Sequence, residues 1–202
     1  MKLFNILRNL PIDLGQEGMR SKTKGKIIAR SLVPQAKEGQ TALDLGCREG
    51  TQSKWLEKKG YKVTSIDIEK NYEKCLIVDC NKKLPFKTGS FNLVWCSEVV
   101  EHLENPGKSV KEMKRVLKPG GLLLVTTPNS RCWFYRILSL AGFKPKKIQN
   151  PDHKHFFGEK DVKSLFQDAK ILGYFPYAIY KATIGRSLNF LTPTFVVIWR
   201  KS

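Results

Sequence analysis

The feature that most constrains this chain is an alternation of short apolar segments with helical patterns over residues 41–128. Helical patterns occupy residues 51–59 and 106–118. The segments with the composition of strands are TALDLG (41–46), YKVTSIDI (61–68), CLIVDC (75–80), FNLVWCS (91–97) and GLLLVTTP (121–128). This alternation predicts an α/β domain built on a doubly wound, mainly parallel sheet.

The pattern changes after Pro128. The elements predicted beyond it are an apolar-basic helix (131–143), a basic loop interrupted by prolines (144–157), an amphipathic helix (159–170) and two strands (174–183 and 192–201). Because the last two strands are close in sequence, they should pair antiparallel. Together with the earlier segments they give a seven-stranded sheet with an antiparallel C-terminal hairpin.

The chain should form a single domain over residues 1–202. A length of 202 residues with 41% hydrophobic residues suits one full core. A helix predicted within 21–34 belongs to an N-terminal helical cap, residues 1–40. The segment 130–158 is interpreted as a lid inserted into the domain, which would select the substrate.

Charge and cysteine content narrow the class of protein. The net charge is +18, and residues 131–202 alone hold 13 basic and 4 acidic groups. Such a surface favours RNA or phosphorylated partners, although solubilising charge without a partner explains it equally well.

Five cysteines without a C-x-x-C pair argue against a disulfide framework and favour a reducing compartment. No apolar run reaches the length of a transmembrane segment and no signal peptide is recognised, so a cytoplasmic protein is predicted. The oligomeric state stays open.

Acidic residues end three successive predicted strands. Asp44 ends the first and leads into a turn that contains Gly46 and Gly50, Asp67 ends the second, and Asp79 ends the third. Glycine lets the backbone approach a ligand closely, and the N-terminus of the following helix offers N–H donors. On open α/β sheets a ligand lies beyond the carboxyl ends of the strands, where an acid after the second strand commonly binds a ribose diol.

These residues, ALDLGCREG (42–50) with Asp67 and Asp79, resemble the class I S-adenosylmethionine (SAM)-dependent methyltransferases, and KPGGLLLVTTPN (118–129) is similar to that family's fifth-strand motif. The resemblance implies the Rossmann-like methyltransferase fold, with SAM as cofactor and S-adenosylhomocysteine as product. A dinucleotide-binding dehydrogenase is the chief alternative, but its G-x-G-x-x-G pattern is absent. Arg48 stands where the family usually has glycine, and we expect the backbone to turn there all the same.

The resemblance also implies which residues contact the cofactor. The loop of Asp44 and Gly46 would hold the methionine part of SAM, and Asp67 would bind the ribose. Asp79 and its neighbour Cys80 would lie near the adenine. The fourth strand ends next to the methionine part. The predicted cofactor-binding set is Asp44, Gly46, Cys47, Gly50, Asp67, Ile68, Asp79, Cys80, Cys96 and Ser97.

The stretch SEVVEHLENP (97–106) carries Glu98, Glu101 and His102, whose spacing puts them on one face of a helix. It is similar to a branch with the motif E-V-x-E-H-L-x-x-P, which includes ubiquinone O-methyltransferases and small-RNA 2′-O-methyltransferases. That resemblance implies a divalent metal on these three residues and a downstream histidine, for which residues 152–157 offer His153 and His155. The predicted metal set is Glu98, Glu101, His102 and His153. Mixed oxygen and nitrogen ligands suit Mn²⁺, Fe²⁺, Co²⁺ or Zn²⁺ better than Mg²⁺. The alternative is a metal-free site in which His102 is the general base or packs under the cofactor.

The sequence therefore predicts a SAM-dependent methyltransferase, with transfer to oxygen on a small-molecule or lipid-like acceptor and His102 as the catalytic residue. An RNA methyltransferase is an alternative because the basic charge concentrates at the predicted lid. The aromatic run Trp133-Phe134-Tyr135 is neutral between these acceptors, since it could stack on a base or cover an aromatic substrate. A SAM-binding protein without turnover is the third alternative.

Overall fold

A computed structural model describes residues 23–143, 146, 149–175 and 182–202 of the chain. Most of the predicted N-terminal cap, four residues of the predicted basic loop (144–145 and 147–148) and residues 176–181 of a predicted strand lie outside the described residues.

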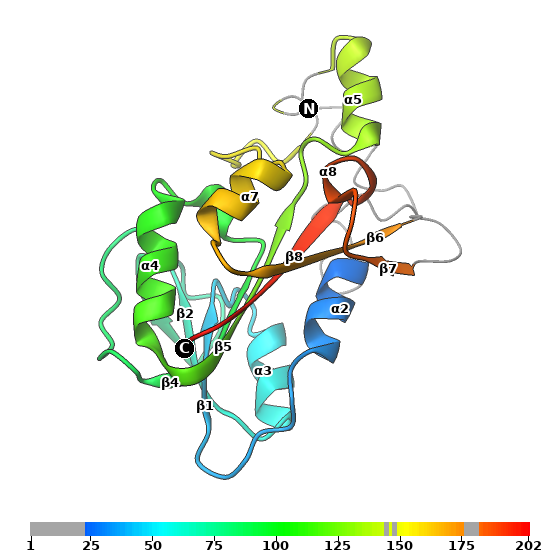
Figure 1. The fold of residues 1–202 in the computed structure, drawn as a ribbon. Helices are drawn as coiled ribbons and strands as arrows, with labels where there is room; N and C mark the ends of the chain where they lie inside the picture. Colours follow the sequence, from blue (N-terminus) through cyan, green and yellow to red (C-terminus); the bar gives the residue numbers. More distant parts are fainter. Residues whose placement is uncertain (1–22, 144–145, 147–148, 176–181) are drawn as a thin grey trace.

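The described strands form one sheet in the order β3-β2-β1-β4-β5-β8-β6-β7 (Figure 1). Their bounds are β1 Thr41–Leu45, β2 Lys62–Asp67, β3 Cys75–Ile77, β4 Phe91–Ser97, β5 Leu117–Pro128, β6 Lys170–Phe175, β7 Ala182–Ile184 and β8 Thr194–Arg200. The first five strands are parallel, whereas β8 lies antiparallel between β5 and β6, and β7 pairs antiparallel with β6. The doubly wound sheet with reversed C-terminal strands is confirmed, and the three-residue β7 adds an eighth strand to the predicted seven.

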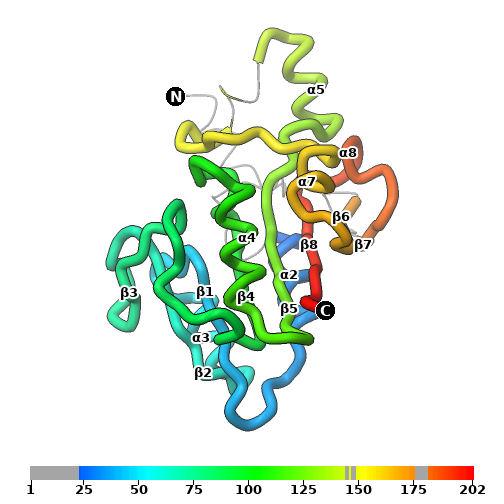
Figure 2. Tube along the Cα trace, turned by 60° about the vertical axis from the view of Figure 1, so that its left-hand side comes forward, coloured from blue at the N-terminus to red at the C-terminus, as the bar shows by residue number. Residues whose placement is uncertain are grey.

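Helices cover both faces of the sheet, which is why its central strands are apolar throughout. The helices are α2 Lys24–Ser31, α3 Thr51–Lys58, the short 3-10 helix η2 Val100–His102, α4 Pro106–Val116, α5 Trp133–Leu140, α7 Glu159–Leu165 and α8 Leu188–Leu191. Ile28 of α2 and Leu56 of α3 belong to the core on one face, and Met113 of α4 and Val162 of α7 to the core on the other. Figure 2 shows α4 running in front of β4 and β5. Within the described part of the chain, no helix combines the length and apolarity that crossing a bilayer requires.

The helix predicted over 159–170 is shorter than expected. It ends at Leu165, and β6 begins at Lys170. Asp168 between them has a left-handed backbone with φ 61°, which a continuing α-helix does not allow. Pairing of Lys170–Leu172 with β8 thus overrides the amphipathic pattern of the sequence. The antiparallel pairing predicted for the C-terminal strands therefore begins at Lys170, before the predicted strand start at residue 174.

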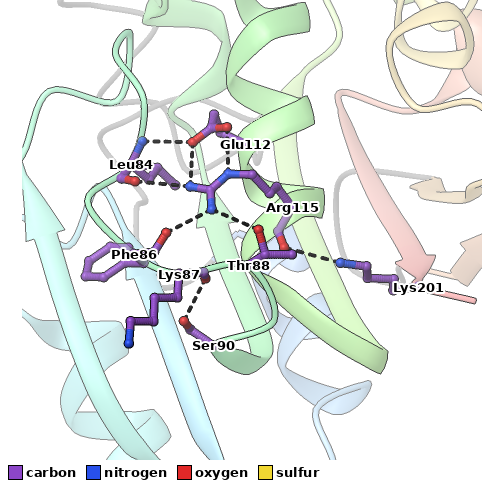
Figure 3. A network of polar contacts seen from close by, with 8 residues as sticks. All are labelled: Leu84, Phe86, Lys87, Thr88, Ser90, Glu112, Arg115 and Lys201. Carbon is purple, nitrogen blue, oxygen red and sulfur yellow. Dashed lines mark hydrogen bonds and ion pairs between the residues drawn. The ribbon is translucent and has the colours of Figure 1, made fainter.

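An arginine network ties α4 to the segment before β4 (Figure 3). The Arg115 guanidinium donates to both carboxylate oxygens of Glu112, at 2.8 Å each, and to the carbonyl oxygens of Leu84 and Phe86. Glu112 also accepts a hydrogen bond from the Leu84 backbone N–H, and these contacts hold the pKa of its carboxyl below the usual range. Lys201 Nζ donates to the carbonyl oxygen of Arg115 at 3.2 Å, so the network also anchors the end of the chain.

Candidate functional site

Two adjoining cavities open at the carboxyl ends of the parallel strands, with volumes of about 500 Å³ and about 80 Å³. Gly46, Arg48 and Glu49 of the loop after β1 line both. The larger cavity is also lined by Asp67, Ile68, Asp79, Cys80 and His102. The smaller one is also lined by Lys26, Asp44, Cys47, Trp95 and Ser97. This position is where a doubly wound sheet binds its ligands.

The loop after β1 takes its shape from three residues in the left-handed region, Gly46 (φ 77°), Arg48 (φ 46°) and Gly50 (φ 73°). A side chain at Gly46 would meet the Val99 methyl, so only glycine fits there. At Arg48 the turn forms without glycine, as expected, and its N–H donates to Asp67 Oδ2 at 2.9 Å. The loop is therefore fastened to the end of β2.

Asp67 and Asp79 sit at the larger cavity with defined partners. Asp67 Oδ1 accepts from the backbone N–H groups of Ile68 at 2.7 Å and Glu69 at 3.4 Å. Because each carboxylate oxygen accepts two hydrogen bonds, Asp67 keeps capacity for a hydroxyl ligand at Oδ2, beside the bond from Arg48. Asp79 Oδ1 accepts from the backbone and side chain of Asn81, and the backbone bond is the main cause that holds the pKa of Asp79 below its usual range.

Asp44 is buried at the smaller cavity, with 1% of its surface exposed. Ser53 Oγ donates to Asp44 Oδ2 at 2.6 Å and in turn accepts from Ser65 Oγ at 2.7 Å. Burial raises the pKa of Asp44 to about 6, against the opposing effects of Ser53 and of the nearby Lys26. Lys26 of α2 is itself buried and was not predicted as a site residue. Its position in a lysine-rich helix looks like ordinary solvated charge, and only the fold brings it to Asp44.

Most of the predicted cofactor-binding residues lie at one or both cavities. Two do not line either one. Gly50 caps the N-terminus of α3. Cys96 is completely buried in the core, so its thiol is part of the packing under the site and not of a cavity wall. The roles of the predicted set in binding remain predictions.

Three of the four predicted metal ligands come together. Ligand atoms of Glu101, His102 and His153 all lie within 4.8 Å of one another. Glu98 is not in this cluster: it lines the larger cavity, and its Oε1 accepts from Thr126 Oγ1 at 2.8 Å. Of the two downstream histidines, the geometry selects His153.

Glu101 is held in the protein interior with 1% of its surface exposed. Thr127 Oγ1 donates to its Oε2 at 3.0 Å, whereas its Oε1 is buried without a hydrogen-bond partner. Burial, and then the neighbouring Glu98, raise the pKa of Glu101 well above the usual range. A buried carboxyl group in this state is stabilised either by protonation or by a bound cation.

The loop that carries the downstream histidines is folded onto η2. The backbone N–H groups of Lys154 and His155 both donate to the Glu101 carbonyl oxygen, at 2.9 and 3.0 Å. His102 Nδ1 lies 3.1 Å from the carbonyl oxygen of Asp152. A carbonyl only accepts, so Nδ1 carries the proton in this pair and Nε2 carries the lone pair that can bind a proton or a metal.

Solved structures share this arrangement of sheet and helices. The fold matches a SAM-dependent methyltransferase from Archaeoglobus fulgidus with a TM-score of 0.65, covering 91% of this chain and 97% of that one at 17% sequence identity. At this identity the likeness shows the fold, which is that of the class I methyltransferases. A family model described as a methyltransferase domain matches residues 17–170. The chain belongs to this family, and the predicted class of SAM-dependent methyltransferases is confirmed.

Among curated proteins the chain is similar to ubiquinone biosynthesis O-methyltransferases. It is 31% identical over 149 residues to the one from Colwellia psychrerythraea, covering 65% of this chain and 57% of the relative. It is 33% identical over 170 residues to the one from Caulobacter vibrioides, covering 74% and 66%. The chain thus spans less than two thirds of the length of these two relatives.

Proposed function

We propose that this chain transfers the methyl group of SAM to a hydroxyl oxygen of a small, lipid-like acceptor in the cytosol. The observation that carries the proposal is the cluster of Glu101, His102 and His153 beside the larger cavity, which the loop after β1 (the acid–glycine loop, Asp44 to Gly50) also lines. Transfer to oxygen on this kind of acceptor is supported by the two relatives that are named ubiquinone biosynthesis O-methyltransferases. The basic segment 130–158 acts as the lid that selects the acceptor within a single domain.

The two cavities suit the two ends of SAM. A volume of about 500 Å³ lies in the range of cofactor sites, and its acids offer acceptors for hydroxyl and amino groups. We assign the ribose diol to Asp67, the adenine amino group to Asp79 and an adenine face to Ile68. In the smaller cavity, the Asp44 carboxylate faces the ammonium group of the methionine part, and the Lys26 ammonium faces its carboxylate.

Bound SAM supplies an activated methyl group on a sulfonium leaving group, so the protein mainly has to orient the acceptor and remove its proton. His102 accepts that proton at Nε2, because Asp152 holds the proton of the ring on Nδ1. Lid contacts to the Glu101 carbonyl keep this ring and His153 in place. Two residues of β5 hold the neighbouring carboxylates in place: Thr126 donates a hydrogen bond to Glu98, and Thr127 donates one to Glu101.

The same cluster fits a divalent metal. The unpartnered Oε1 of Glu101 supplies one oxygen, and His102 and His153 supply imidazole nitrogen, a set that suits Mn²⁺, Fe²⁺, Co²⁺ or Zn²⁺. A metal there would lower the pKa of the acceptor hydroxyl. His102 would then serve as a ligand and not as the base.

The test is transfer of labelled methyl from SAM to a lipid extract and, separately, to total RNA, each with and without EDTA. We expect label in the lipid extract, lost in His102→Ala and kept in the matched lid variant His155→Ala, whose ring lies outside the cluster. Sensitivity to EDTA assigns His102 to the metal, and insensitivity assigns it to the base. Label in RNA alone would refute the acceptor class. No label in either, with SAM bound, would refute turnover.

A further inference from the structure

Helix α5 exposes an unusual amount of apolar surface at its C-terminal end. Ile137 is 56% exposed, Leu140 is 90% exposed, and Phe143, just beyond the helix, is 42% exposed. Ile137 and Leu140 are three residues apart, so their side chains lie on one side of the helix axis. The opposite side is packed, because Tyr135 is buried and Leu138 lies against its cluster.

The end of α5 is a built structure that presents these side chains. Gly142 adopts φ 82°, its N–H donates to the Ser139 carbonyl oxygen at 3.0 Å, and the Phe143 N–H donates to the Leu138 carbonyl oxygen at 2.9 Å. These two bonds and the left-handed glycine form a Schellman motif, which ends the helix and fixes the residue after it. Phe143 is therefore held beside the helix.

A fourth large exposed hydrophobic side chain lies near this helix. Phe190 of α8 is 49% exposed, and the Arg136 guanidinium lies 5.8 Å from its ring centroid. We call Ile137, Leu140, Phe143 and Phe190 the apolar tip. Half of the eight large exposed hydrophobic residues of the described chain belong to it.

The segment that contains α5 and Phe143 carries charge of one sign. Residues 131–147 hold two arginines and three lysines and no aspartate or glutamate. Among these, Arg131, Arg136 and Lys146 are exposed, and Arg131 forms an ion pair with Asp161 of α7 at 3.1 Å. A second copy of this strongly basic chain would bring like charges together at the tip, whereas an anionic surface complements them.

The apolar tip is coupled to the candidate site through the chain. Helix α5 follows directly on β5, and both views show it projecting beyond the layers of the sheet (Figures 1 and 2). The Ser130 N–H, just before α5, donates to the Phe157 carbonyl oxygen at 2.9 Å, and Ser130 Oγ donates to Gln149 at 2.8 Å. The base of α5 is thus fastened to the segment that carries His153.

We propose that the apolar tip is a docking surface for membranes that contain anionic lipids. The apolar side chains enter the boundary between headgroups and acyl chains while the flanking arginines and lysines contact lipid phosphates, as interfacial protein segments do. Docking in this way is peripheral. It does not depend on which acceptor is methylated, so it can be tested without knowing the acceptor.

Cosedimentation of the full chain with vesicles tests the proposal. The probes are vesicles of phosphatidylcholine alone and of phosphatidylcholine with phosphatidylglycerol, at low and high salt. We expect binding to the anionic vesicles that weakens with salt. The double variant Ile137→Ser with Leu140→Ser should bind at least about tenfold more weakly, since each side chain loses its apolar contact with lipid.

The matched control is the double variant Ile27→Ser with Leu76→Ser, which removes two aliphatic side chains that are 47% and 52% exposed elsewhere. It should bind like the wild type. Equal binding by all three proteins would overturn the apolar tip as the docking surface, and so would a wild type that ignores anionic vesicles. A dimer of the wild type that dissociates in the Ile137→Ser, Leu140→Ser variant, measured by sedimentation velocity, would assign the tip to a second copy and overturn the proposal.

Discussion

Replacing Asp44 with asparagine should change stability in a way that depends on pH. In the folded chain the pKa of Asp44 rises from 3.8 to about 6. The folded state therefore binds a proton more tightly than the unfolded state, and the free energy of unfolding falls as pH rises between these two values. At a pH above both values, the ionised carboxylate costs the folded state about 3 kcal/mol, at about 1.4 kcal/mol for each tenfold change in proton affinity.

Asp44→Asn removes this cost at high pH. It also alters the hydrogen bond from Ser53, which is worth about 1 kcal/mol. The variant should therefore be more stable than the wild type by about 2 kcal/mol near pH 8, and less stable by about 1 kcal/mol near pH 4. In the difference between the two proteins, the titration of all other groups cancels to first order.

Urea unfolding of both proteins between about pH 4 and pH 8, followed by tryptophan fluorescence, measures this difference. We expect it to change sign within the interval, with most of the change below the pKa of about 6. A difference that is constant with pH would refute the account of Asp44 as a carboxylate whose charge is destabilised by burial. A wild type that is more stable than the variant at pH 8 would refute it as well.

Two further substitutions test the loop after β1 and the network under α4. Gly46→Ala should lower the free energy of unfolding by about 2 kcal/mol, because the new side chain meets Val99 and the backbone has a positive φ. Adding Val99→Ala should recover only the part of this loss that is due to the contact. Full recovery of stability, or no recovery, in urea unfolding would contradict the division of the loss between contact and backbone. Arg115→Ala should cost about 2 kcal/mol because it removes the guanidinium that donates to Glu112 and leaves the carbonyl oxygens of Leu84 and Phe86 without this donor. By contrast, Lys74→Ala breaks a solvent-exposed ion pair and should leave the free energy of unfolding nearly unchanged. Equal losses would mean that the Arg115 network adds no more than a surface pair.

The central part of the fold could be predicted from local sequence. The five parallel strands fall on apolar or β-branched segments, and helices join β1 to β2 and β4 to β5, so composition and period suffice to predict them. The grouping of Asp44, Asp67 and Asp79 was also predictable, because each lies at the end of a parallel strand and the carboxyl ends of parallel strands meet at one edge of the sheet. The left-handed turn at Arg48 is not visible in its residue type, and it depends on the bond to Asp67.

Features that depend on contacts across the chain were not predictable. The end of α7 is decided by pairing of β6 with β8, which no local pattern at Asp168 reveals. Lys26 reaches the site only because α2 packs across the sheet. His153 was in the predicted metal set, but nothing in the local pattern separates it from His155, because the difference depends on how their loop folds onto the Glu101 carbonyl.

Calorimetric titration of the full chain with S-adenosylhomocysteine tests the central claim most directly, because it asks whether the acid–glycine cavity binds this cofactor. The account predicts one site, with affinity lower by at least about tenfold in Asp67→Asn, which loses charge-assisted bonds to the ribose diol. The surface variant Glu57→Gln, whose side chain lines neither cavity, should bind like the wild type. Absence of binding, or equal binding by the wild type and Asp67→Asn, would contradict the assignment of this site to SAM.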